Sequence, residues 1–233
     1  MKKVIFWDFD GTLVYFTSWR LAVMDALDEL EPEHNINHDD IRPYLRNGFP
    51  WHRPDEPHIH LDTPDDWWQA HKPLFLGCYQ GIGFPVERAE ELATLVRKHM
   101  TKPGRFPLYE DAVPTLAALK NLGWTNIILS NHLPELPDII EGMEISPYIS
   151  GCLTSAVTGY EKPNPHAFQL ALEHSGYPEA VWMVGDNINS DVKGAEGVGI
   201  PAILVHNPPE DEVKYYAENL NGIIDIIECE TSL

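Results

Sequence analysis

Short apolar runs recur along the chain, and most are followed by a stretch with helical spacing. The first run, Val4-Ile5-Phe6-Trp7, is uninterrupted and ends at Asp8, as a strand buried on both faces of a parallel sheet would. Similar runs occupy 126–129, 149–153, 181–184 and 202–205, and helical patterns occupy 111–122, 134–143, 165–175 and 188–196. Strand followed by helix, repeated in this way, predicts an α/β fold with a doubly wound parallel sheet.

The segment between Tyr15 and about Arg105 has a different pattern. Strand-like runs disappear, and apolar residues take helical spacing at 18–30, 65–79 and 86–100. The stretch 46–64 is rich in Pro and His and has no period, so we predict a long loop, a kind of segment that is often functional. The chain is therefore predicted to form a Rossmann-like core from residues 1–15 and 106–233, with a helical lobe, residues 16–105, inserted into it.

Composition narrows the class of protein. The 233 residues carry a net charge of −20, which disfavours binding to nucleic acid or to anionic membranes. No stretch approaches the ~20 apolar residues that span a bilayer, and the first run meets Asp8 too early for a signal peptide, so we expect a cytoplasmic protein. Cys78, Cys152 and Cys229 are widely spaced, which argues against a disulfide framework or a zinc site.

Polar residues that could take part in catalysis or ligand binding follow the apolar runs. In an open α/β sheet, ligands bind beyond the carboxyl ends of the strands, so these residues are expected to meet. The first run is followed by Asp8 and Asp10, the second by Ser130 and Asn131, the third by Lys162, and the fourth by Asp186 and Asp191. One such residue is weak evidence, since Asp often forms turns. Four groups in order, each after its own strand, predict an active site.

At these positions the chain resembles the haloacid dehalogenase superfamily. The matching motifs are Asp8-Phe9-Asp10-Gly11-Thr12, the strand-terminal Ser130, Lys162, and the acidic run from Gly185 to Asp191. The resemblance implies a Rossmann-like core, and the helical lobe resembles the cap of the superfamily's phosphatases, which include phosphoglycolate phosphatases and nucleotidases. It further implies Mg²⁺ as cofactor, held by Asp8, Asp186 and the backbone oxygen of Asp10.

Residue chemistry agrees with a phosphatase. A carboxylate such as Asp8 can attack phosphorus and form an acyl phosphate that water later breaks. Asp10 is the candidate acid that protonates the leaving oxygen and the base that then activates water. The superfamily's dehalogenases lack this second Asp, because a halide leaves without a proton, so Asp10 argues against dehalogenation.

The remaining motif residues are expected to offset the negative charge of the carboxylates and of the phosphoryl group. Four carboxylates in one pocket repel each other unless a hard divalent cation intervenes. Asp191 is expected to hold metal-bound water or Lys162, although a plain acid in the first turn of a helix is the simpler alternative. Lys162 offsets the charge of Asp8 and the phosphoryl group, and the Ser130 hydroxyl with the Asn131 and Gly11 amides would bind phosphoryl oxygens.

The lobe carries weaker evidence. Arg53, a cation on the long loop, is a candidate substrate contact, and His132 faces either the substrate or a neighbouring helix. Several aromatic and histidine side chains of the lobe either line a pocket or simply pack: Trp19, Trp51, His52, His58, His60, Trp67 and Trp68.

The predicted function is hydrolysis of a small phosphorylated metabolite by a Mg²⁺-dependent phosphatase. A phosphotransferase or phosphomutase that uses the same aspartyl-phosphate is the nearest alternative. A non-catalytic phosphate-binding protein is a third, but it predicts a damaged motif, and all four motifs are intact. The substrate and the oligomeric state are not encoded in any pattern that we can identify.

Overall fold

A six-stranded sheet forms the centre of the molecule. The computed structural model describes residues 2–61, 63–209 and 211–231. All six strands are parallel, in the order β3-β2-β1-β4-β5-β6. Their bounds are β1 (Lys3–Trp7), β2 (Trp124–Ser130), β3 (Ile149–Thr154), β4 (Ala180–Gly185), β5 (Ala202–Val205) and β6 (Tyr215–Ala217). The predicted doubly wound α/β fold is confirmed.

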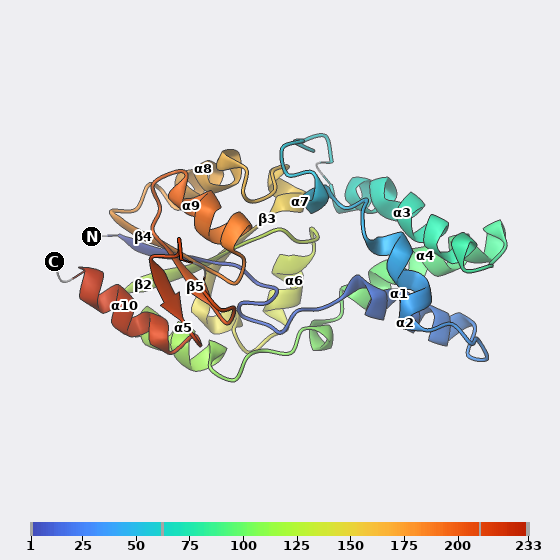
Figure 1. Cartoon of the computed structure of the whole chain (residues 1–233), viewed down its shortest axis with the longest axis horizontal. Coiled ribbons are helices and arrows are strands. Elements are labelled where there is room, and N and C mark those ends of the chain that lie inside the picture. The colour runs from blue at the N-terminus through green and yellow to red at the C-terminus, as the bar shows by residue number, and fades with distance from the viewer. Residues whose placement is uncertain (1, 62, 210, 232–233) are drawn as a thin grey trace.

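Helices cover both faces of the sheet (Figure 1). One face packs against α5 (Ala112–Asn121), α6 (Leu136–Glu141) and α10 (Gly222–Thr231), and the other against α8 (Pro165–His174) and α9 (Gly194–Glu196). Alternate residues of β1 enter the two cores, with Ile5 in the first and Phe6 in the second. Burial on both sides explains why this strand is uninterruptedly apolar.

Several elements differ from the sequence prediction. Strand β6, the short helices α2 (His38–Ile41) and α7 (Ser155–Thr158), and helix α10 were not predicted. The pattern at 188–196 is a π-helical turn, Ile188–Lys193, followed by α9. The turn begins at Asn187, whose side chain accepts hydrogen bonds from the Asn189 and Ser190 amides. A wider π-helical turn, capped by the Asn187 side chain, thus replaces the first regular turn of the predicted helix.

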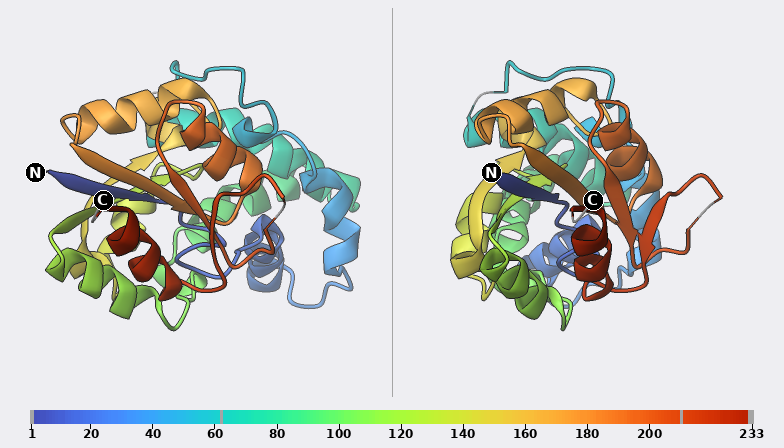
Figure 2. Two further views of the ribbon diagram at one scale, coloured as in Figure 1. Left: turned by 60° about the vertical axis from the view of Figure 1, so that its left-hand side comes forward. Right: turned by 90° about the vertical axis from the view of Figure 1, so that its left-hand side faces the viewer.

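The inserted lobe, called the cap from here, is helical as predicted. It contains α1 (Trp19–Leu30), α2 (His38–Ile41), α3 (Pro64–Gly81) and α4 (Val86–Met100), with 3₁₀ turns at Arg42–Leu45 and Pro50–His52. Figure 1 and the left view of Figure 2 show these helices together beyond one end of the sheet. Their apolar faces form the centre of the cap, where the buried Tyr79 donates a hydrogen bond to the Val23 carbonyl.

Two chain crossings join cap and core, and they run next to each other. The Tyr15 amide donates to the Pro107 carbonyl at 2.9 Å, and the Tyr109 amide donates to the Leu13 carbonyl at 3.0 Å. The Thr17 hydroxyl donates to the Arg105 carbonyl at 3.1 Å. The crossings lie near residues 16 and 105, where the sequence predicts the boundaries of the cap. The exact boundaries stay a prediction.

The state of the cysteines and the character of the helices were also predicted from the sequence. Cys78 is buried, Cys152 is half-buried and Cys229 is exposed, and all three are free thiols. Within 2–61, 63–209 and 211–231, none of the helices has the length and apolar character needed to cross a bilayer.

Candidate active site

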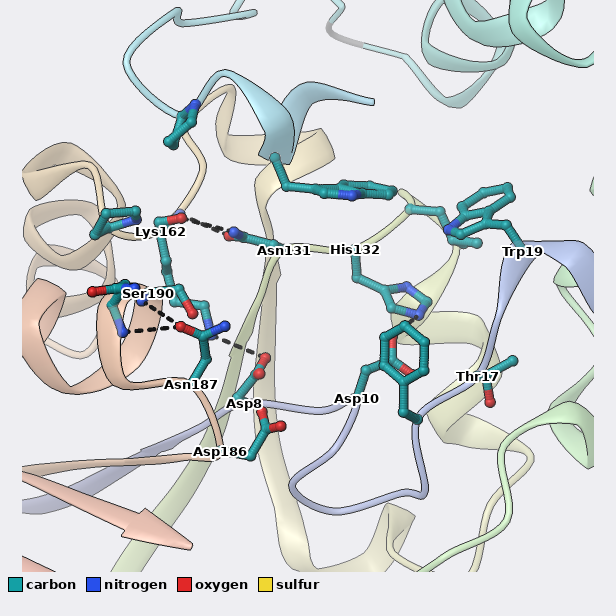
Figure 3. A pocket seen from close by; sticks show the side chains of 16 residues that line it. Asp8, Asp10, Thr17, Trp19, Asn131, His132, Lys162, Asp186, Asn187 and Ser190 are labelled. Carbon is teal, nitrogen blue, oxygen red and sulfur yellow. Dashed lines mark hydrogen bonds and ion pairs between the residues drawn. The ribbon is translucent and has the colours of Figure 1, made fainter. Parts of the chain in front are cut away.

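The site lies where the strand order reverses. The chain adds β2 and β3 on one side of β1 and then returns to add β4 on the other side. The loops that leave β1 and β4 therefore diverge and leave a crevice between them, which is the usual ligand site in such sheets. The Asp8 amide donates to the Val184 carbonyl at 2.9 Å, so Asp8 is fixed at the mouth of this crevice. Figure 3 shows Asp8, Lys162 and Asp186 close together there.

The Asp8 carboxylate is held by two donors. The Ser130 hydroxyl donates to Asp8 Oδ1 at 2.8 Å, and Lys162 Nζ lies 2.9 Å from the same oxygen. Only 9% of Asp8 is exposed. Both donors fix the orientation of the carboxylate, which is what a nucleophile at this position requires.

Lys162 is a buried cation with two carboxylate partners. Its Nζ lies 2.6 Å from Asp191 Oδ1, in addition to its contact with Asp8. Burial alone would lower the pKa of Lys162, but the charges of Asp191 and Asp8 outweigh burial and raise the pKa above its ordinary value. Lys162 is therefore positively charged at neutral pH.

The Asn131 side chain fixes the backbone of Lys162. Asn131 Oδ1 accepts from the Lys162 amide at 2.7 Å, and Asn131 Nδ2 donates to the Lys162 carbonyl at 2.8 Å. The sequence prediction assigned Asn131 a backbone contact with the phosphoryl group. The structure adds a positioning function for its side chain, which joins the loop after β2 to the loop that carries Lys162.

Asp191 is fully buried, and both of its oxygens have partners. Oδ1 contacts Lys162, and Oδ2 accepts from the Asn187 amide at 3.0 Å. A Cβ on Gly185 would collide with this carboxylate, so only glycine at the end of β4 leaves room for it. The contacts favour the predicted supporting role, in which Asp191 holds Lys162.

Three carboxylates form a group that a metal ion fits. Oxygens of Asp8, Asp186 and Asp191 all lie within 4.8 Å of one another. Burial, followed by the charges of Asp8 and Asp191, raises the pKa of Asp186 to about 7. Asn207 Nδ2 donates to the carbonyl and, at 3.2 Å, to Oδ2 of Asp186. Repulsion of this kind is relieved by a hard cation, for which carboxylate oxygens are the preferred protein ligands.

Asp10 has the protonation state of an acid. Burial raises its pKa to about 8, with further increases from Asp8 and Asp186, while a hydrogen bond to the Thr17 backbone opposes the rise. At neutral pH in the metal-free protein, most Asp10 carboxyls therefore carry a proton. A proton donor two residues after a nucleophile matches the predicted division of roles.

His132 lies beside Asp10 and packs on aromatic rings of the core. Its Nε2 lies 3.4 Å from Asp10 Oδ2, and its ring meets the Phe9 ring edge-on at 5.5 Å. Burial lowers the pKa of His132 to about 4, so the ring is neutral. Neither ring nitrogen hydrogen-bonds another described residue. His132 thus lines the cavity beside Asp10 and also packs on core rings, so a substrate contact stays a prediction.

The Gly11 amide, predicted to bind a phosphoryl oxygen, has a backbone partner in this structure. It donates to the Val14 carbonyl at 2.8 Å, so it is not free to bind a phosphoryl oxygen. The Gly11 backbone has a φ of +79°, and a Cβ there would collide with the Asp186 carboxylate. Glycine is needed at this position for the turn and for the close approach of Asp186.

The raised pKa values of Asp10 and Asp186 predict how pH and metal affect stability. Each carboxyl binds its proton more tightly in the folded chain than at the ordinary value of 3.8. The resulting stabilisation is full below that value and is lost as pH rises through 7 and 8. Between pH 6.5 and 8, we expect the metal-free protein to lose about 2 kcal/mol of unfolding free energy from these groups.

Magnesium ions should reverse this loss, because they bind deprotonated carboxylates. Thermal unfolding with a chelator and with Mg²⁺, at pH 6.5 and pH 8, measures the effect. We expect a larger rise in Tm at pH 8. The range stays above pH 6.5 because His132, whose pKa is lowered, removes stability only as pH falls below that value. An equal or larger rise at pH 6.5 would contradict the assignment.

Comparison with known proteins identifies the family. A family model described as haloacid dehalogenase-like hydrolase matches residues 2–199. The chain belongs to the haloacid dehalogenase-like hydrolase family. A phosphoserine phosphatase from Thermus thermophilus is 34% identical over 142 residues, which are 59% of this chain and 56% of that protein. The chain thus matches little more than half the length of this relative.

Other relatives extend the match to the cap. The rhythmically expressed gene 2 protein of Drosophila melanogaster is 25% identical over 94% of this chain and 89% of its own length. The solved HAD-hydrolase YfnB from Bacillus subtilis superposes with a TM-score of 0.73 over 97% of this chain and 99% of that one, at 16% identity. At this identity the solved structure shows a shared fold, including a helical cap beside a Rossmann-like core.

The haloacid dehalogenase-like site opens into a cavity of about 530 Å³ between core and cap. The cap residues that line this active-site cavity are all uncharged: Phe16, Thr17, Trp19, Trp51 and Pro54. Trp51 stacks on Phe49 at 4.5 Å with an angle of 9°, and Trp19 lies 4.7 Å from the same ring. Of the predicted candidates, Trp19 and Trp51 therefore line the cavity, whereas Trp67 and Trp68 are buried in the apolar cluster.

Arg53 does not reach the active-site cavity. Its guanidinium pairs with Glu56 at 2.9 Å, and its side chain is 64% exposed. The predicted substrate contact is therefore absent in this structure, because the loop turns Arg53 outward. His58 from the same loop turns inward and contacts Glu161 at 3.0 Å, with both side chains buried. The cap loop thus packs on the segment that carries Lys162.

Some site residues were missed by the sequence reasoning. Asn207 contacts Asp186 and follows β5 by two residues, so the rule that found the other strand-end residues also points to it. Glu161 is next to Lys162, but its partner His58 is 103 residues away. No local pattern predicts that pairing.

Proposed function

We propose that this chain is a magnesium-dependent phosphomonoesterase that hydrolyses a small phosphorylated metabolite through an aspartyl-phosphate on Asp8. The supporting observation is that Asp8, oriented by Ser130 and Lys162, and a protonated Asp10 line the same cavity. Relatives named phosphoserine phosphatase, glyceraldehyde 3-phosphate phosphatase and ribulose-1,5-bisphosphate 5-phosphatase support a phosphate ester as substrate.

The proposed reaction has two displacements. An Asp8 oxygen attacks phosphorus, the bond from phosphorus to the ester oxygen breaks, and Asp10 gives its proton to the departing alkoxide. Asp10, now ionised, takes a proton from water as the water oxygen attacks the same phosphorus. The acyl phosphate bond breaks, inorganic phosphate forms, and Asp8 returns as a carboxylate with Asp10 protonated again.

Asp8, Asp186 and the backbone oxygen of Asp10 would hold Mg²⁺, which supplies positive charge beside the phosphoryl oxygens. The grouped oxygens of Asp8, Asp186 and Asp191 support this proposal, as does the structural relative solved with magnesium. Asp191 has both oxygens engaged, so we propose that it orients Lys162. Lys162 offsets the charge of Asp8 and of the approaching dianion.

The cap contributes apolar side chains to the active-site cavity. Trp19 and Trp51 line it together with the carboxylates of the core, and water that these rings exclude would leave stronger electrostatic interactions at Asp8. The Ser130 hydroxyl contacts Asp8 in the free structure. We propose that it also donates to a phosphoryl oxygen once Asp8 is esterified.

The test of this function is release of inorganic phosphate from a panel of phosphorylated metabolites and from p-nitrophenyl phosphate. Assays run with Mg²⁺ and with a chelator, and with and without a sugar-phosphate acceptor. Hydrolysis that requires Mg²⁺ is the expected result. Transfer of phosphate to the acceptor without release would replace the hydrolase by a phosphotransferase or mutase, and no turnover of any ester would contradict the proposal.

Asp10→Asn is expected to affect esters according to their leaving groups. An alkoxide needs a proton to leave, whereas p-nitrophenolate leaves readily without one. We expect kcat for an alkyl phosphate to fall by about 100-fold or more, and kcat for p-nitrophenyl phosphate to fall much less. Steady-state kinetics on the two substrates measures the difference. Equal losses would argue against Asp10 as the acid.

A further inference from the structure

All seven arginines of the chain lie in the cap, between residues 20 and 105. Four of them pair with carboxylates: Arg53, Arg88, Arg97 and Arg105. Arg20, Arg42 and Arg46 have no carboxylate partner within the described part of the chain. With 36 acidic residues and 16 basic ones, partners are abundant, so this lack of pairing is a property of the place where the three arginines lie.

The three unpaired arginines line one cavity of about 230 Å³, which we call the arginine pocket. No acidic residue is among its lining side chains in the described ranges. Arg20 Nε donates to the Ser18 hydroxyl at 3.2 Å, which keeps this guanidinium at the start of α1. The partial positive charge at that helix N-terminus adds to the arginine charges. Three guanidinium groups around one small space repel each other until an anion enters.

The arginine pocket adjoins the active-site cavity. Phe16, Trp19 and Trp51 line both spaces. Trp51 stacks on Phe49 and the tilted Trp19 ring packs against the same ring, so the shared wall is formed before any ligand binds. A molecule with its ester at Asp8 has neutral aromatic groups beside it and positive charge beyond them.

We propose that Arg20, Arg42 and Arg46 bind a phosphate or carboxylate group, either the second anionic group of the substrate or a free anion. Arginine suits this because its planar donors match both groups and it stays charged at all relevant pH values. The substrate-borne alternative rests on the proposed phosphatase function. It names the substrate class as small phosphate esters with an anion at the end remote from the scissile bond.

Paired substrates test the substrate-borne source. We would compare fructose 1,6-bisphosphate with fructose 6-phosphate, and 3-phosphoglycerate with glycerol 3-phosphate, by kcat/KM at low ionic strength, where screening is weak. The wild type should prefer the substrate with the second anion in at least one pair. Arg42→Gln and Arg46→Gln should each reduce that preference about tenfold, the usual size of one charge-assisted contact.

Arg53→Gln is the matched control. It removes the same charge from the same cap, and its side chain is exposed like those of Arg42 and Arg46, but it lies outside both cavities. We expect it to leave the preference intact. Thermal unfolding of all variants excludes loss of folding as the cause.

A second assay tests the free anion. Calorimetric titration of the wild type with succinate, a dicarboxylate without an ester, should show binding that Arg42→Gln weakens and Arg53→Gln does not. A response in either assay supports the arginine pocket, and the assay that responds shows whether the bound anion belongs to the substrate or is free. Neither response, in a protein that hydrolyses p-nitrophenyl phosphate, would overturn the pocket and leave the phosphatase standing. Succinate binding that Arg42→Gln weakens, in a protein that hydrolyses no ester, would keep the arginine pocket and contradict the phosphatase function.

Discussion

Asp8→Asn is expected to abolish phosphate release, with a loss in kcat of about 10⁴-fold or more, because an amide is a far poorer nucleophile than a carboxylate. Asn still offers an oxygen to Ser130 and Lys162, so the hydrogen bonds around position 8 are largely kept. The variant also removes the charge of Asp8, which repels the ionised forms of Asp186 and Asp10. In the metal-free protein we therefore expect an unchanged or higher Tm. Phosphate release and thermal unfolding measure the two effects.

Asp138→Asn is the control for this substitution. Asp138 is an exposed residue of α6, so the same chemical change there should leave both activity and Tm near the wild-type values. Mass spectrometry after rapid quenching of the wild type should detect phosphate on Asp8. An Asp8→Asn variant with substantial hydrolysis would remove covalent catalysis from the mechanism, whatever its stability.

Lys162→Met is expected to reduce both stability and activity. Asp191 has no exposed surface, and Lys162 is the cation that pairs with it. Removing one partner of a buried pair leaves the other charge uncompensated, which typically costs 3–5 kcal/mol, so we expect about 3 kcal/mol less unfolding free energy. We expect kcat/KM to fall by about 10³-fold, because a fixed positive charge beside the phosphoryl group is lost. Denaturant unfolding and steady-state kinetics provide the measurements.

A double variant separates the two losses. Adding Asp191→Asn to Lys162→Met removes the uncompensated charge, so we expect part of the stability to return while activity stays low. Lys120→Met, at an exposed position of α5, is the control for loss of a lysine. If the double variant were as active as the wild type, Lys162 would have no electrostatic function in catalysis. If it recovered no stability, the buried pair would not be the source of the loss.

Strand-end residues explain why so much of the site was predictable. Burial on both faces makes the later residues of β1, β2 and β4 apolar, so each strand is visible in the sequence together with the polar residue that follows this apolar run. Parallel strands bring their carboxyl ends to one edge, and Asp8, Ser130 and Asp186 meet there as predicted. Strand β6 was less visible, because it has three residues and two of them are only half-buried.

The cap was predictable as a set of helices but not as a binding surface. Helical spacing identified α1, α3 and α4, since one face of each is buried. Which loop residue faces the substrate depends on how the loop folds back on the core. Arg53 turned outward, Trp51 turned toward the cavity, and His58 found a partner 103 residues away in Glu161.

The sequence by itself determined the core fold, the identity of the carboxylates and the lysine, and their order along the chain, because these follow from local periodicity and from the edge at which parallel strands end. Only the tertiary structure decided how those groups are used. In the folded chain the Gly11 amide donates to the Val14 carbonyl, and the Asn131 side chain binds the Lys162 backbone. Three cap arginines line one pocket. The physical reason is distance along the chain: Ser130 and Asp8 are 122 residues apart, and contacts of that separation depend on packing that no local pattern records.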